Sequence, residues 1–172
     1  MAKKYIMFLD ETGRSLVQTC PFTITGVIFE YKYAVDNKET GANSKLRNKF
    51  NHFKRQCFGR DDIPLHLRKI LEGHPPFSES HGITKDNLQK FWDTLPDFLE
   101  DLHFKIISVT VDKQKLDKYY STPKDPYVVF AHIMKPLFSF LNDSSVKSIR
   151  IVLESRDDYQ NLLMQKAFFD IL

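Results

Sequence analysis

Two predicted β-strands of this chain end in acidic residues. The apolar run Tyr5–Leu9 leads into Asp10. The apolar run Ile149–Leu153 leads into Glu154. Carboxylates suit hard divalent cations such as Mg²⁺ or Mn²⁺, which take few protein oxygens and complete their shell with water and phosphate. Two such ions about 4 Å apart can activate a water and stabilise the leaving oxygen of a phosphodiester. If their strands are neighbours, these acids predict one divalent-metal site of a nuclease.

The same acids also have structural explanations, which stay open at this point. Asp10 fits a turn, and Glu154 fits a position beside a helix cap. Asp112 ends a third predicted strand, so it is a candidate third metal ligand or the cap of a helix that follows it. Glu11 would face away from Asp10 if the strand continued, because successive side chains alternate between the two faces of a sheet.

Histidine and cysteine offer weaker signals. His66 is either a hydrogen-bonded structural residue or, near a metal, a group that acts as general base or orients water. His74, His81 and Cys57 do not combine with it at any standard zinc-site spacing. The second cysteine, Cys20, forms no CxxC pair with Cys57, and both are typical of reduced thiols in a cytoplasmic protein.

The most basic segment is a predicted helix that begins at Asn43 or Ser44 and ends near Phe58. It is either a solvated helix face or a surface that contacts phosphates, and Arg156 is either a phosphate contact or the partner of an acid. The candidate nucleic-acid contacts are Lys45, Arg47, Lys54, Arg55 and Arg156. A formal net charge of +3 allows a polyanionic partner without requiring one.

Composition favours one globular domain over residues 1–172. The chain has 42% hydrophobic and 27% charged residues, which is ordinary for a soluble protein. No apolar run approaches the roughly 20 residues of a membrane span, and we expect no membrane partner. Walker loops, dinucleotide-binding glycine motifs and nucleophile elbows are absent from the sequence. The chain stops inside the apolar helical pattern 167–172, as expected of a domain truncated at its C-terminus.

Periodicity predicts an α/β fold in which a mixed sheet begins with an antiparallel hairpin. Gly26 indicates a bulge or a close backbone approach within its strand. Thr84 and Asn87 predict a capped helix start, and Pro96 predicts a kink or a split in that helix. No helix is expected in 32–42 or 59–83. The predicted strands are 5–9, 22–30, 104–112 and 149–154, and the predicted helices are 43–58, 84–102, 125–141 and 157–171.

In order and spacing, these pieces resemble the domain-of-unknown-function 3800 (DUF3800) family, a group predicted to be RNase H-like. Segment 6–13 resembles its opening strand and Asp-Glu-Ser-Gly motif, with Thr12 in place of serine. The remaining matches are 22–28 to its second strand, Leu65 and His66 to its Glu-Leu-His element, 125–127 to a helix opening and 152–156 to a late Glu-Ser-Arg motif.

The resemblance implies an RNase H-like fold and a metal-dependent phosphodiesterase. It also implies that Asp10 and Glu154 bind the metal, with His66 beside them. Two departures reduce the set of ligands. Pro64 stands where the family has glutamate, and its C-terminal Gln-x-x-Asp motif is absent, because Gln165 is followed three residues later by phenylalanine.

Three hypotheses follow from the sequence. The first is a nuclease that cleaves DNA or RNA with Mg²⁺ or Mn²⁺. The second is a nucleic-acid-binding module that has lost part of its ligand set. The third is an assembly domain, in a homo-oligomer or a larger complex, whose apolar C-terminal helix docks on a partner.

Overall fold

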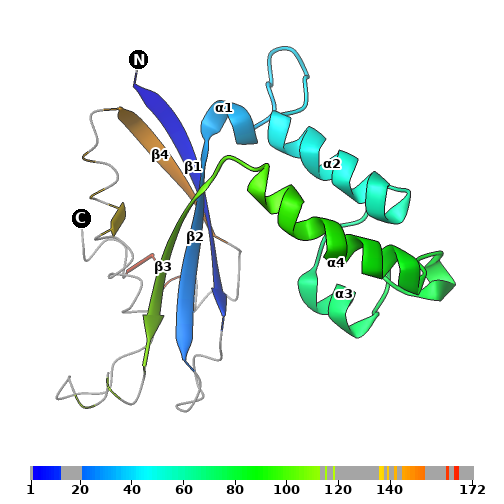
Figure 1. Cartoon of the computed structure of the whole chain (residues 1–172). Coiled ribbons are helices and arrows are strands. Elements are labelled where there is room, and N and C mark those ends of the chain that lie inside the picture. Colours follow the sequence, from blue (N-terminus) through cyan, green and yellow to red (C-terminus); the bar gives the residue numbers. More distant parts are fainter. Residues whose placement is uncertain are drawn as a thin grey trace. The chain divides into compact units, whose positions relative to one another are not determined.

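The computed structural model describes residues 2–12, 21–112 and 145–153, together with a few single positions after Asp112. The chain divides into two compact units, and each is treated by itself. A sheet unit contains Met1–Tyr31 and Phe104–Leu172, and a helical unit contains Lys32–His103. Figure 1 shows the elements of both along the chain. The predicted helices 125–141 and 157–171 lie outside the described residues, apart from single positions.

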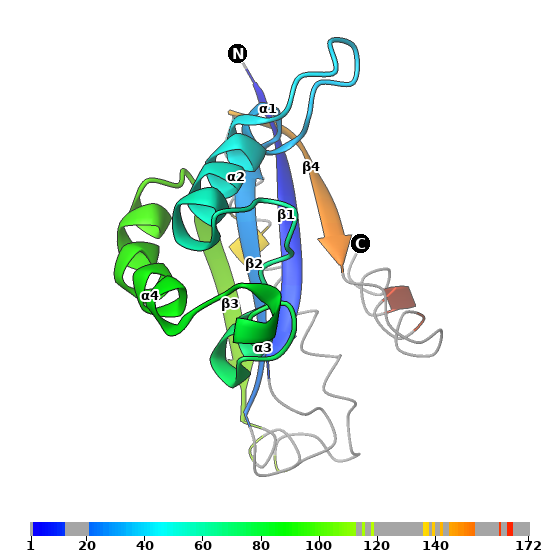
Figure 2. The same cartoon turned by 90° about the vertical axis from the view of Figure 1, so that its right-hand side faces the viewer.

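Within its described residues, the sheet unit contains four strands in the order β3-β2-β1-β4. β1 pairs with β2 in antiparallel and with β4 in parallel, while β2 and β3 are antiparallel (Figures 1 and 2). The strands are β1 (Lys3–Thr12), β2 (Phe22–Glu30), β3 (Lys105–Val111) and β4 (Val146–Leu153). The predicted α/β class, with a mixed sheet that opens on a hairpin, is therefore confirmed.

One face of the sheet carries its core. Met7 is fully buried, and Leu9 and Ile24 are exposed by 5% and 3%. Gly26 lies opposite Leu9, and a Cβ placed there would be 2.8 Å from Met7 Sδ and 2.9 Å from Leu9 Cδ2. The β1–β2 register runs past Gly26 without a break. The close approach predicted for this glycine is therefore confirmed, and no bulge is present there.

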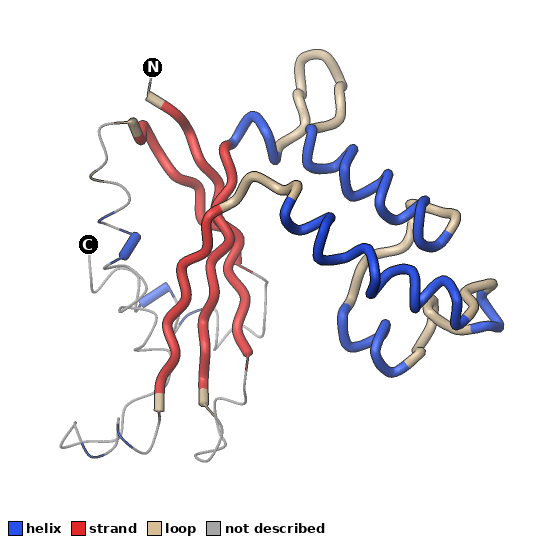
Figure 3. Tube along the Cα trace, in the orientation of Figure 1, coloured by secondary structure: helices blue, strands red, loops and turns tan. Residues whose placement is uncertain are grey.

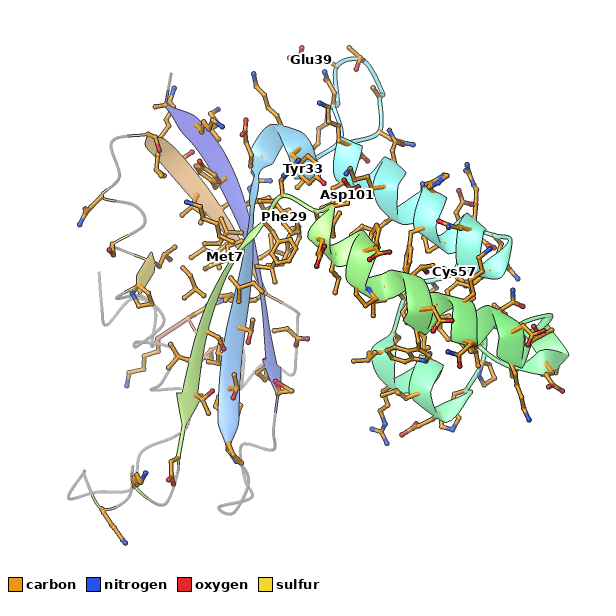
Figure 4. All side chains as sticks on the ribbon, viewed as in Figure 1. Met7, Phe29, Tyr33, Glu39, Cys57 and Asp101 are labelled. Carbon is orange, nitrogen blue, oxygen red and sulfur yellow. The ribbon has the colours of Figure 1, made fainter. Side chains whose placement is uncertain are left out.

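The opposite face of the sheet is more exposed. It carries Phe8, Asp10 and Thr12 from β1, because these residues alternate with the buried Met7 and Leu9. We call this the open face. At the end of the open face away from Asp10, Phe29 is 7% exposed and packs against Phe104 with ring centroids 6.0 Å apart. Figure 4 labels Met7 on the core face and Phe29 on the opposite one.

The helical unit contains two long helices, α2 (Lys45–Phe58) and α4 (Lys85–Glu100). Ser44 caps α2 by accepting a hydrogen bond from the Arg47 N–H at 3.1 Å. Thr84 and Asn87 form the predicted capping box of α4. Pro96 lies inside α4, which continues through it as one helix. Figure 3 shows the strands in red and the helices in blue.

An aromatic core holds the helical unit together. Phe53 is 3% exposed and stacks on Phe98 with ring centroids 4.1 Å apart. Cys57, labelled in Figure 4, is fully buried, and its Sγ lies 3.5 Å from Thr94 Oγ1. The other buried members of this core are Phe58, Ile63, Ile70, Phe77, Ile83 and Phe91. Burial of these side chains stabilises the unit through the hydrophobic effect and close packing.

Two short helices and one 3₁₀ turn were not expected from the sequence. α1 (Tyr31–Ala34) begins directly after β2, partly within the segment predicted to be a loop. α3 (Leu67–Glu72) and the 3₁₀ helix η1 (Glu79–His81) occupy the proline-rich region. α3 buries Ile70 in the aromatic core and ends at Gly73, whose φ of 62° is left-handed.

Candidate metal and nucleic-acid site

The strands that precede the two key acids are direct neighbours. β1 and β4 run in parallel, and Leu9 pairs with Leu153. Asp10 is the next residue of β1 after this pair, and Glu154 is the next residue of the sequence after Leu153. The expected neighbourhood of the two strands is confirmed. Glu154 itself lies outside the described residues, so its convergence with Asp10 stays a prediction.

The Asp10 carboxylate is exposed on the open face. Its Oδ1 accepts a hydrogen bond from the Glu11 N–H at 2.9 Å. Among the described residues, its Oδ2 has neither a hydrogen bond nor an ion pair. Glu11 is only half exposed and lies on the core face, since β1 continues to Thr12. The expectation that these two acids face apart is therefore confirmed, and Asp10 is the one available at the open face.

Hydroxyl groups extend from Asp10 across β2 and β3 on the open face. Asp10 lies opposite Thr25, and Thr25 lies opposite Ser108 in the next strand. The Thr25 and Ser108 hydroxyls are 3.0 Å apart, and those of Thr23 and Thr110 are 2.9 Å apart. In each pair one hydroxyl donates to the other, so one hydroxyl hydrogen remains for a ligand. The sequence analysis missed these residues, although the alternating threonines of β2 were a visible signal.

Asp112 does not lie in the row of Asp10. Ser108 shares that row, and Asp112 follows Ser108 by four residues, which is about 13 Å further along an extended strand. Its Oδ1 accepts a hydrogen bond from the Lys115 N–H at 3.2 Å, and its Oδ2 lies 3.5 Å from Lys115 Nζ. This geometry matches the capping role rather than a third metal ligand.

His66 belongs to the helical unit, whereas Asp10 belongs to the sheet unit. It precedes α3 as the N-cap residue, and its exposed side chain makes no capping hydrogen bond. A role beside Asp10 stays a prediction. Across the described part of the chain, no three or more His, Cys, Asp or Glu side chains form a group that could hold a metal ion.

Several cations of the basic helix α2 have nearby acids or backbone carbonyls as partners. Arg47 forms an ion pair with Asp36 at 2.9 Å, and Arg55 pairs with Asp61. The Lys54 ammonium donates to the backbone carbonyls of Asp61 and Ile63. These three side chains therefore have structural partners, which favours the solvated-face explanation of this segment.

Two candidate phosphate contacts differ from these. Lys45 is exposed and has no ion pair within the described ranges. Arg156 lies outside the described residues. A shallow groove of about 600 Å³ beside α2 is lined by Arg47, Phe50, Asn51, Lys54, Asp61 and Leu65. Arg47 is ion-paired with Asp36 and the Lys54 ammonium is engaged by two backbone carbonyls, so both cations of this groove already have partners in the fold.

The chain is thus a mixed α/β protein with an exposed carboxylate, Asp10, in line with the Thr25 and Ser108 hydroxyls. Comparisons with protein-family models, curated proteins and solved structures find no match. Among the described helices, none has the length and apolar character needed to cross a membrane.

Proposed function

We propose that this chain is a metal-dependent nuclease with an RNase H-like fold, in which Asp10 and Glu154 hold Mg²⁺ or Mn²⁺. One observation carries the proposal: the parallel pairing of Leu9 with Leu153, each of which an acid follows in the sequence. The mixed sheet and its opening hairpin support the RNase H-like fold. The substrate would be DNA or RNA.

The donor set fits such a cation. Mg²⁺ is commonly bound by one or two carboxylates, with waters and substrate phosphate as its other ligands. Asp10 is exposed and keeps one carboxylate oxygen without a hydrogen bond among the described residues. Two carboxylates held close together repel each other unless a cation lies between them. A bound cation would supply an activated water and charge stabilisation for phosphodiester hydrolysis.

The other side chains of the row would orient the substrate. The hydroxyl hydrogen left over by the Thr25–Ser108 pair can donate to a phosphate or sugar oxygen beside Asp10. The Asp10 carboxylate is itself oriented by the Glu11 N–H. His66 would assist water or substrate if it reaches this edge.

A second candidate is a nucleic-acid-binding module without catalysis. Two observations favour it: Pro64 replaces the glutamate of the resembled motif, and Asp112 lies about 13 Å further along the sheet than the row of Asp10. Both reduce the number of ligands available to a second metal ion.

A cleavage assay separates the two candidates. Labelled single- and double-stranded DNA and RNA are incubated with Mg²⁺, with Mn²⁺ and with chelator. The nuclease should cut only with metal, and Asp10→Asn or Glu154→Gln should reduce the rate at least about a hundredfold. Glu11→Gln is the matched control, because Glu11 is the next residue after Asp10 but its side chain lies on the core face.

Cutting that persists in chelator or in Asp10→Asn would refute the nuclease. Binding of nucleic acid without cutting by any metal would instead support the binding module.

A further inference from the structure

An apolar row crosses the open face next to the row of Asp10. Phe8 pairs with Val27 of β2 and with Val152 of β4, and Val27 pairs with Ile106 of β3. Phe8 is 40% exposed, Ile106 58% and Val152 37%. Together with the half-buried Val27 they form a continuous apolar row across the four strands, which is more informative than one exposed side chain.

The Phe8 ring packs against another aromatic ring of the same sheet. It meets Phe29 edge to face, with centroids 6.3 Å apart and an interplanar angle of 68°. Phe29 is itself buried and packs on Phe104. Phe8 therefore loses little side-chain entropy when a flat ligand covers it, which favours binding.

Polar groups border this row on both sides. The row of Asp10, Thr25 and Ser108 lies on one side of it, toward the C-terminal ends of β1 and β4. In the other direction Arg150 pairs with Ile6, one row away from Phe8 on the same face. Arg150 is exposed, and its guanidinium carbon lies 5.7 Å from the centroid of the Tyr31 ring. A cation–π contact of this kind positions the guanidinium while leaving its N–H donors available.

We propose that the open face binds single-stranded nucleic acid, with one base stacked on Phe8 and a backbone phosphate bound by Arg150. This inference rests on the proposed function and names its substrate class. The strand would run along β1 and β4, from Arg150 toward Asp10, over about 13 Å. Aromatic stacking combined with a backbone cation is the usual way to bind single strands.

The pattern of the face favours this ligand over a protein partner. The exposed apolar side chains occupy one row between hydroxyls and a cation, since Ile6 and Phe29 in the row of Arg150 are buried. The core of a protein interface is a broader exposed apolar patch. It also disfavours a duplex, because paired bases are stacked on each other and present no free face to Phe8.

Equilibrium binding in chelator tests the proposal without cleavage. The probes are fluorescein-labelled oligothymidylate, oligouridylate and a DNA duplex, measured by anisotropy with the whole chain. Single strands should bind more tightly than the duplex. Phe8→Leu should weaken single-strand binding at least about fivefold, and Phe8→Tyr should not. Arg150→Gln should weaken it and lower the slope of log K against log salt by about 1.

Leu71→Ala is the matched control, because Leu71 is 66% exposed on α3 in the other unit. Unfolding midpoints of all variants identify any loss of fold, and Arg150→Gln keeps the proposal testable if Phe8→Leu unfolds. Absence of single-strand binding, equal binding of the duplex, or unchanged binding by Phe8→Leu would overturn the inference. Self-association abolished by Phe8→Leu would assign the surface to a protein partner instead.

The two proposals fail separately. Metal-dependent cutting with unchanged affinity in Phe8→Leu would leave the nuclease intact and remove the stacking site. Single-strand binding that depends on Phe8, without any cutting, would support the stacking site and refute the nuclease.

Discussion

Leu9 of β1 and Leu153 of β4 are partners in a parallel pair, and both strands lead toward the same edge of the sheet. Leu9 is 5% exposed and belongs to the core face. A slip of one residue in β1 would turn Met7 and Leu9 to the open face, so the burial of these two side chains fixes the register of β1. The partner residue Leu153 is 37% exposed. The same register therefore fixes the position of the Asp10 side chain on the open face, one residue after Leu9.

A shared cation at this edge predicts that the two acids are coupled. Asp10→Asn and Glu154→Gln should each weaken Mn²⁺ binding at least about tenfold, because each removes one ligand charge. The double variant should lose less than the sum of the two free-energy changes, since the first substitution already disables the site. Calorimetric titration with Mn²⁺ measures all four proteins. Strictly additive losses would indicate two independent ions.

Gly26 is predicted to be intolerant of a side chain. Gly26→Ala should lower the free energy of unfolding by about 1–3 kcal/mol, because the new methyl group overlaps the buried Met7 and Leu9 side chains. Urea denaturation followed by circular dichroism measures the change.

The Met7→Ala background provides the control for Gly26. Met7→Ala alone should cost about 2–5 kcal/mol, because Met7 is fully buried. In that background the added cost of Gly26→Ala should shrink, since Met7 Sδ is the nearest atom. An equal cost in both backgrounds would mean that overlap with Met7 is not the cause.

The Lys49–Asp101 ion pair predicts a pH dependence of stability. The Lys49 ammonium, which hydrogen-bonds the Asp101 carboxylate, lowers the pKa of that carboxyl below its ordinary value of 3.8. The pair therefore stabilises the fold above about pH 4, and this contribution is lost as pH falls through the lowered pKa. Asp101→Asn should reduce stability slightly at pH 7 and not at all in strong acid.

Thermal unfolding between pH 2.5 and 7 in low salt checks this expectation. Asp97→Asn is the control, one turn earlier on α4 and without an ion pair among the described residues. High salt should shrink the effect of Asp101→Asn, because exposed charges are screened. A larger effect in acid than at neutral pH would contradict the assignment.

Local signals in the sequence were sufficient for the elements that local chemistry defines. The Thr84–Asn87 capping box and the apolar run that became β1 are of this kind. α3 was missed because its N-cap is a histidine without a capping bond and its helix is only six residues long. It depends on Ile70 reaching the aromatic core, which is a tertiary effect.

The candidate site shows the same division. The acids at strand ends are visible in the sequence, but the pairing of β1 with β4 joins segments far apart along the chain. The number of cations in α2 also overstates the positive charge that this helix can offer a ligand. Asp36 and Asp61 come from loops, and they form ion pairs with α2 in the folded structure. The hydroxyl partners of Thr25 and Thr23 likewise come from a distant strand.

Ile28 of β2 is paired with Lys105 of β3, so the backbone departs from and rejoins the sheet at adjacent positions with the whole of Lys32–His103 in between. Neighbouring antiparallel strands can be joined by a turn of a few residues. The order and direction of β2 and β3 therefore do not require a segment of this length between them. During evolution that segment could be lengthened, replaced by an unrelated one or deleted, while the edge that bears Asp10 kept its connectivity.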